Sequence, residues 1–183
     1  MNGRIDSGLG QIIIDTDVIA HEIVEPNSDC LNELVDYFGD SILNDDKTLN
    51  RKKLASIAFS DKQKTEALSN ITHKYIKAEV VKDINTTDAE LVGIDGAVII
   101  GSNVEPLCEF IVSVIADKQS RITRIKMRDN ITDEQAIQRI NAQNDDEFYK
   151  ENSMYIIYNN GDIAQLESDV VVLFNKIKGN SFE

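Results

Sequence analysis

The sequence predicts an α/β fold in which a mainly parallel sheet carries helices on both faces. Short apolar runs rich in Ile and Val alternate along the chain with segments of helical spacing. Strands that alternate with helices favour a parallel sheet. The run over residues 110–116 is dominated by apolar side chains, and such a run is typical of a parallel strand that is covered on both faces.

In the first half of the chain we predict one strand and then four helices. The β-branched run over residues 12–15 predicts a buried strand. Thr16 or Asp17 is the predicted N-cap of the next helix, over residues 18–24, which stops at Pro26. Helical spacing predicts three further helices: residues 31–38, ending at Gly39; residues 51–59, capped by Asn50; and residues 62 to about 82, capped by Asp61.

The second half of the chain alternates strands with helices. Residues 90–94 predict a strand, and the apolar residues 97–100 predict a loop or the start of a helix. The remaining predicted elements are a strand over 110–116, a basic helix over 117–128, a helix from Thr132 with a capping box to Gln135, a strand over 154–158 and a helix over 163–178. We expect a single domain over residues 1–183, because no flexible linker interrupts this order.

Charge and cysteine content limit the kinds of partner and compartment. A net charge of −13 at pH 7 argues against binding to nucleic acid or to an anionic membrane, because both need clustered positive charge. Cys30 and Cys108 have no metal-binding or redox spacing, which favours reduced thiols in a cytoplasmic protein. No apolar run approaches the ~20 residues of a transmembrane helix, and we expect no signal peptide.

Residues 3 to 10 resemble a phosphate-binding loop that has lost its chemistry. The frame G-x-x-x-x-G runs from Gly3 through Ser7 to Gly8. In an intact loop the next two residues are a Lys that reaches the outer phosphates and a Ser or Thr that holds Mg²⁺. Leu9 and Gly10 occupy these two positions, so the loop should grip a triphosphate poorly.

Five segments from residue 12 onward together resemble the dephospho-CoA kinase family. They are IDTDVIAHEIVEP, similar to the family's IDAD-x-IAH; YFGDSILNDDKTLNRKKLASIAFSD, similar to its FG-x-x-IL and LNR-x-x-L stretch; LSNITHKYI; RITRIKMRDNITDEQAIQRINAQ, similar to its lid; and YIIYNNGDIAQL, similar to its VIDNNG segment. The resemblance implies a P-loop kinase fold. It also implies transfer of the ATP γ-phosphate to the ribose 3′-hydroxyl of dephospho-CoA, with Mg²⁺.

The resemblance assigns catalytic and acceptor-binding roles to four residues. Asp17 matches the family carboxylate thought to accept the ribose proton, and Asp15 stands beside it. Carboxylates at a strand end suit a proton acceptor or a Mg²⁺ ligand, whereas the alternative is that Asp17 only caps the next helix. Arg51 and His73 match the acceptor region, which spans helices over about residues 18–82. Their alternatives are a solvated charge and a structural histidine.

The lid, about residues 117–150, carries three arginines that match the family: Arg124, Arg128 and Arg139. Arginines on a lid neutralise the charge of the transferred phosphate. The alternative is that they form surface ion pairs with Asp129 or Asp133.

A turn near the C-terminal end of the chain matches the adenine side of the family site. Asn159 and Asn160 occupy this turn, although the pair alone indicates only a turn. The resemblance therefore implies a CoA-like ligand or an adenine nucleotide. ATP and Mg²⁺ are expected only if the site is active, and the sequence assigns no set of metal ligands.

Departures from the family fall where its chemistry lies. Gly10 and Asp17 are too close for the helix that should follow the loop, so we expect this helix and the family's central first strand to be truncated or missing. Gly101 replaces a family Glu, and Tyr158 replaces the Asp of VIDNNG.

Three interpretations fit these observations. We favour a catalytically inactive homologue that keeps a binding or assembly role. The second interpretation is a working dephospho-CoA kinase in which Arg4 replaces the loop lysine. The third is a structural or interaction protein that binds no small molecule. Its sheet, without a central strand, would present an edge to a second copy or to a protein partner.

Overall fold

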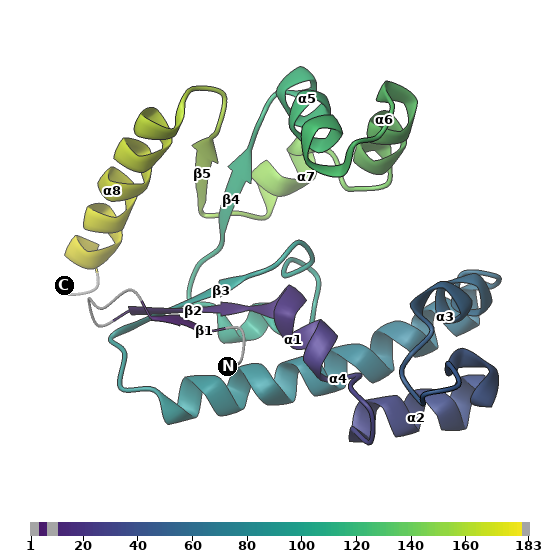
Figure 1. Ribbon diagram of the computed structural model, residues 1–183. Coiled ribbons are helices and arrows are strands. Elements are labelled where there is room, and N and C mark those ends of the chain that lie inside the picture. Colours follow the sequence, from purple (N-terminus) through teal and green to yellow (C-terminus); the bar gives the residue numbers. More distant parts are fainter. Residues whose placement is uncertain (1–3, 7–10, 181–183) are drawn as a thin grey trace. The chain divides into compact units, whose positions relative to one another are not determined.

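The computed structural model describes residues 4–6 and 11–180 and confirms the α/β class (Figure 1). The chain divides into two compact units, residues 1–108 and 109–183, and each described unit contains a parallel strand pair with its own helices. That both units belong to one domain stays a prediction. Among the described residues, no helix is both long and apolar enough to cross a membrane.

The sheet of the first unit has the strand order β1-β2-β3. Its strands are β1 (Arg4–Asp6), β2 (Gln11–Asp15) and β3 (Leu91–Asp95). β2 and β3 are parallel and in register from Gln11 beside Leu91 to Asp15 beside Asp95. β1 pairs antiparallel with β2, and it was not predicted because three residues carry no hydrophobic pattern.

The helices of the first unit are α1 (Thr16–Glu22), α2 (Asp29–Phe38), α3 (Arg51–Ala58) and α4 (Lys62–Thr86), with 3₁₀ turns η1 (Asp40–Ile42) and η2 (Glu105–Leu107). Asn50 and Asp61 cap α3 and α4 as predicted. The predicted cap of α1 was wrong, because Asp15 at the end of β2 accepts hydrogen bonds from the first free N–H groups of the helix. Residues 97–100 form turns rather than a helix.

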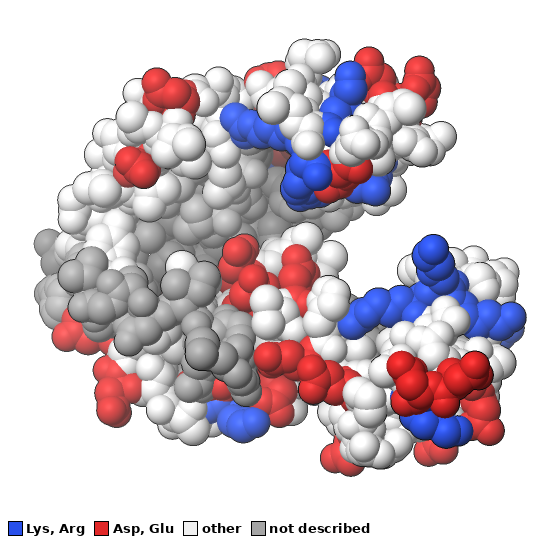
Figure 2. Space-filling model, viewed as in Figure 1, with Lys and Arg blue, Asp and Glu red and all other residues white. Residues whose placement is uncertain are grey.

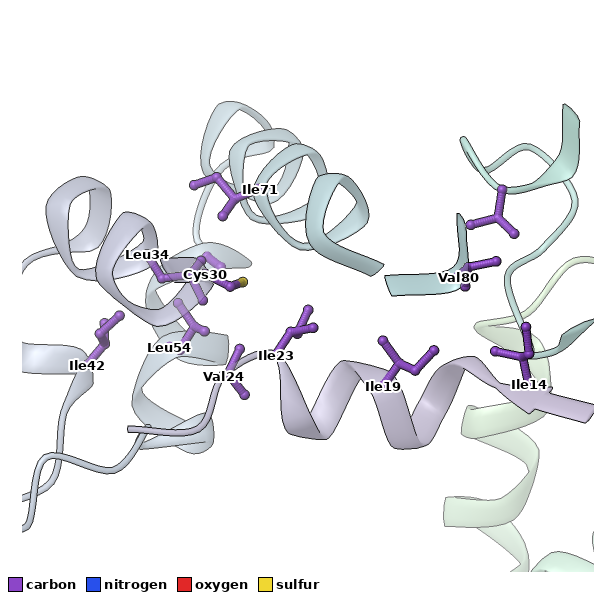
Figure 3. Close-up of a cluster of buried hydrophobic side chains, with 12 residues drawn as sticks. Ile14, Ile19, Ile23, Val24, Cys30, Leu34, Ile42, Leu54, Ile71 and Val80 are labelled. Atoms are coloured by element: carbon purple, nitrogen blue, oxygen red, sulfur yellow. The ribbon is translucent and has the colours of Figure 1, made fainter. Parts of the chain in front are cut away.

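The core of the first unit lies where α1, α2 and α4 converge with β2. Ile14, Leu34, Ile42 and Val80 are fully buried, and Figure 3 shows Ile14, Ile19 and Ile23 following one line of β2 and α1 toward the α2 side chains. Partly buried apolar residues of β3 pack against the same cluster. The parallel pair β2–β3 therefore packs against α1, α2 and α4 through one apolar cluster.

Over residues 109–180, the second unit contains a two-stranded parallel sheet and four helices. They are β4 (Val112–Ile115), α5 (Lys118–Asp129), α6 (Asp133–Asn141), α7 (Asp146–Glu151), β5 (Tyr155–Tyr158) and α8 (Ile163–Asn180). Ser113 and Ile115 of β4 are buried while Val114 is 58% exposed, so the prediction of a strand covered on both faces was wrong. The capping box of Thr132 and Gln135 is present as predicted.

Replacing Leu34 with Ala should lower the free energy of unfolding by about 2–5 kcal/mol, because it leaves a cavity in a site that has no solvent access. Urea unfolding followed by circular dichroism measures this loss. Asn32→Ala, at an exposed position of the same helix, is the matched control and should change stability by no more than about 0.5 kcal/mol. Equal losses for the two variants would contradict the assigned core.

The thiol of Cys30 should be unreactive in the folded protein. Burial raises its pKa to about 11, so only about one thiol in a thousand is ionised at pH 8, and the thiolate is the reactive form. In the Cys108→Ser variant, a chromogenic disulfide reagent at pH 8 should therefore label Cys30 only after urea is added. Fast labelling in buffer alone would show that the α2 core opens readily.

Candidate functional site

The first candidate site lies at the carboxyl ends of β2 and β3. The strand pair ends with Asp15 beside Asp95, and α1 begins at the next residue, Thr16. Asp17 therefore lies in the first turn of α1, where its side chain is exposed. Ligands of open α/β sheets bind outside the carboxyl ends of the strands, so these carboxylates occupy a position suited to ligand contact.

The carboxylates of Asp15 and Asp17 have different tasks. Asp15 Oδ1 accepts hydrogen bonds from the backbone N–H groups of Asp17, at 2.9 Å, and Val18, at 3.0 Å. Within the described part of the chain, the Asp17 carboxylate has no hydrogen-bond or ion-pair partner. The alternative in which Asp17 is only a helix cap is thus wrong, because Asp15 is the cap and Asp17 remains available to a ligand.

The structure places Arg51 and His73 on α3 and α4, two helices that pack against each other (Figure 1). Arg51 is the exposed first residue of α3 and is followed by Lys52 and Lys53, and Figure 2 shows basic side chains gathered over this helix. His73 is half-buried, and its carbonyl accepts a hydrogen bond from the Asn103 amide at 3.0 Å. No described contact joins Arg51 or His73 to the carboxylates of α1.

The predicted loop remnant cannot be placed in the same way. Gly3, Ser7, Gly8, Leu9 and Gly10 lie outside the described residues. The described strands on either side of residues 7–10, β1 and β2, are antiparallel neighbours.

The second candidate site lies at the carboxyl ends of β4 and β5. The Asn160 side-chain oxygen accepts a hydrogen bond from the N–H of Asp117, the N-cap of α5, at 2.8 Å. The Asn159 N–H donates to the Ile115 carbonyl at 2.7 Å, and the Asn159 carbonyl accepts from Arg124 Nη2 at 3.0 Å. The structure thus brings the predicted turn and one predicted lid arginine together.

A surface pocket of about 630 Å³ opens beside this turn. Its lining residues are Arg124, Asn159, Gly161, Asp162, Ile163, Ala164 and Leu166. The volume falls within the range of about 300–1,000 Å³ that is usual for small-molecule sites. One guanidinium and one carboxylate stand among apolar side chains, so the pocket suits a ligand with an apolar body and a polar or charged end.

The other two predicted lid arginines are engaged elsewhere. Arg128 Nε donates to Asp129 Oδ1 at 2.8 Å, and Arg139 pairs with Asp129 Oδ2. The hydrogen bond from Arg128 holds the pKa of Asp129 below its usual range. Arg128 and Arg139 remain 74% and 54% exposed, so these surface pairs are weak and a stronger anion can compete for both guanidinium groups.

Sequence reasoning missed several residues of these sites. Asp95 is the last residue of β3, and Asp117 follows β4 and caps α5. An Asp directly after a β-branched run in the sequence could have indicated both residues. Thr16 was considered only as a helix cap, and nothing in the sequence indicated its bond to Asp95. Arg121, which pairs with Asp146 at 2.9 Å, was not considered because α7 was not predicted. Among the described residues, no group of three or more His, Cys, Asp or Glu side chains is arranged to hold a metal ion.

The chain has clear relatives among known proteins. A family model described as dephospho-CoA kinase matches residues 4–165. The chain is 34% identical over 168 residues to the dephospho-CoA kinase of Lactobacillus johnsonii, which covers 90% of this chain and 85% of that one. It is 33% identical over 171 residues to the dephospho-CoA kinase of Listeria monocytogenes, covering 92% and 86%.

Solved structures give the same result. The dephospho-CoA kinase from Campylobacter jejuni matches with a TM-score of 0.62 at 28% identity, over 92% of this chain and 86% of that one. The crystal structure of TT1252 from Thermus thermophilus matches with a TM-score of 0.76 at 21% identity, over 90% and 83%, which supports the fold alone. Together with the family model and the relatives near 33% identity, these matches show that the chain belongs to the dephospho-CoA kinase family.

Proposed function

We propose that this chain binds the acceptor or an adenine nucleotide as its kinase relatives would, but does not transfer phosphate from ATP. The observation that carries the proposal is the pair Leu9–Gly10, which stands where an intact loop has Lys and a hydroxyl residue. The backbone N–H groups of an intact loop and its lysine supply most of the grip on the triphosphate, and the hydroxyl holds Mg²⁺. Their loss should cost on the order of 10³-fold or more in rate.

The arrangement of the first two strands supports the same conclusion. A phosphate loop leads from a strand into a helix whose N-terminal N–H groups face the phosphates. Here the strand before residues 7–10 is β1, and the element after them is β2, which runs antiparallel to it. Because β2 begins at Gln11, directly after the position of Gly10, a strand follows the loop frame where the helix that should cradle the phosphates would begin.

The acceptor half is proposed to work through Asp17. Its exposed carboxylate at the end of β2 can accept a hydrogen bond from a ribose hydroxyl, while Asp15 is occupied in capping α1. Mg²⁺ usually binds one or two carboxylates and keeps several waters. Asp17 could therefore hold a Mg²⁺ ion that arrives with a phosphate-bearing ligand, and the ion would neutralise phosphate charge there.

The adenine side is proposed to be the pocket beside Asn159. Ile163, Ala164 and Leu166 offer apolar surface to a flat ring, and Arg124 offers a guanidinium to a phosphate. This assignment rests on the pocket and on the family resemblance of the Asn159 turn. Each role can be removed singly without touching the core of either unit.

A working dephospho-CoA kinase is the second candidate function. It is favoured by the identity near 33% to proteins that are named as such kinases. In that case a basic residue other than the missing lysine must grip the triphosphate, and Arg4 is the nearest to the loop in the sequence.

A coupled assay decides between the two functions. With ATP, Mg²⁺ and dephospho-CoA, the purified protein should produce no CoA above the rate of a protein-free control. The Listeria monocytogenes kinase provides the positive control. Product formation that rises in proportion to protein concentration and disappears in Arg4→Ala would establish the working kinase instead.

Ligand binding should survive the loss of transfer. Dephospho-CoA at 100-fold its dissociation constant should stabilise the protein by ~2.7 kcal/mol, which thermal unfolding detects as a rise of several degrees in Tm. Arg51→Ala and Arg124→Ala should each reduce the rise for dephospho-CoA or ADP, whereas Lys118→Ala, an exposed position on α5, should not. No shift with either ligand would favour a purely structural or interaction role.

A further inference from the structure

Thr16 is a buried polar residue at the junction of β2 and α1. Its side chain is 6% exposed, and its hydroxyl donates a hydrogen bond to the backbone carbonyl of Asp95 at 2.9 Å. Asp95 is the residue that pairs with Asp15 in the β2–β3 register. The bond therefore links β3 to the first turn of α1, one residue beyond the last paired residue of β2. The family pattern IDAD has alanine at this position, which has no hydroxyl to donate.

Gly96 leaves the space that the Thr16 hydroxyl occupies. A Cβ atom built at Gly96 would lie 2.0 Å from Thr16 Oγ1, far inside the contact distance of real atoms. The backbone of Gly96 does not have a positive φ, so conformation does not explain the glycine. The close approach of the Thr16 hydroxyl does, because any side chain at residue 96 would occupy the space of that hydroxyl.

This contact ties the first turn of α1 to the end of β3. Thr16 lies between Asp15, which caps the helix, and Asp17, whose carboxylate is exposed. The cap bonds from Asp15 hold this first turn to the end of β2, and the Thr16 bond ties it across to β3. Loss of the hydroxyl would free the first turn from β3 and would also leave the Asp95 carbonyl without this donor.

We propose that Thr16 and Gly96 form a clamp that holds α1 against β3, and that Thr16 is thereby the positioning residue for the Asp17 carboxylate. This inference rests on the proposed contact of Asp17 with the acceptor. The position of the Asp17 carboxylate then depends on the hydroxyl of Thr16 and on the absence of a side chain at Gly96. Neither residue is proposed to contact the ligand. Small misplacements of a contacting group have large effects on binding and chemistry.

A double-mutant cycle tests the clamp itself. Gly→Ala substitution at a compatible backbone position normally stabilises a protein, because the unfolded chain loses freedom. We expect Gly96→Ala to lower the urea midpoint strongly in the Thr16 protein, owing to the clash at 2.0 Å, and clearly less in the Thr16→Ala background, where only the tight contacts with Ile99 Cδ1 at 3.3 Å and with the Cβ of residue 16 at 3.4 Å remain. The same destabilisation in both backgrounds would overturn the clamp, since Gly96 would then be required for another reason.

A second cycle tests positioning, with dephospho-CoA as the probe and calorimetry at a temperature where circular dichroism shows each variant folded. Thr16→Val, which keeps the shape and loses the hydroxyl, should weaken dephospho-CoA binding about fivefold to tenfold, and Thr16→Ser should restore it. In the Asp17→Asn background, Thr16→Val should have less than about a twofold effect, because the group being positioned is gone.

The outcomes separate the inference from the proposed function. Equal weakening by Thr16→Val in both backgrounds would mean that Thr16 acts on the fold generally, and this would overturn its role as a positioning residue. If Thr16→Val bound dephospho-CoA as tightly as the unchanged protein does, the role of Thr16 as a positioning residue would also be overturned. Absence of binding by the unchanged protein would overturn the acceptor-binding function and the positioning role together, while the stability cycle would still support or overturn the clamp.

Discussion

The parallel register of β2 with β3 is the constraint on which the first unit depends. It joins two segments that are far apart in the sequence and sets Asp15 beside Asp95 at one end of the sheet. Because α1 starts directly after β2, the same register decides where the first turn of that helix lies. The buried residues Ile14 and Ile19 then anchor the strand and the helix in one apolar cluster. The position of the exposed Asp17 thus depends on this strand register and on the buried packing of the strand and helix that carry it.

Local sequence rules predicted the elements that local interactions determine. Asn50, Asp61 and the Thr132–Gln135 pair cap the predicted helices because each bond closes within three residues of the cap. The cap of α1 was predicted wrongly by one or two positions. Asp15 was assigned to the strand, and it serves as the last residue of the strand and as the cap at once.

The candidate site was less accessible from the sequence, because it depends on contacts between distant residues. The family motifs located Asp17, Arg124 and Asn159, and the structure brings the last two within hydrogen-bond distance. The motifs could not indicate that Arg128 and Arg139 both pair with the carboxylate of Asp129. No spacing rule in the sequence determines which acidic side chain pairs with a surface arginine. The bond from Thr16 to Asp95 spans 79 residues, and one Thr in an apolar segment gives no warning of it.

The antiparallel pairing of β1 with β2 has a consequence for the order in which the chain can fold. Asp6 pairs with Ile12, which is six residues further along the chain, whereas Ile12 pairs with Val92 only after α1, α2, α3 and α4 have been made. Pairings between near neighbours form on the microsecond scale, and pairings across long loops are slow. During synthesis, β1 can therefore pair with one edge of the apolar Ile12–Ile14 strand long before β3 has been translated. β1 lies on the opposite edge of β2 from β3, so it covers one edge throughout, and only the edge that β3 later fills is open to pairing with another chain.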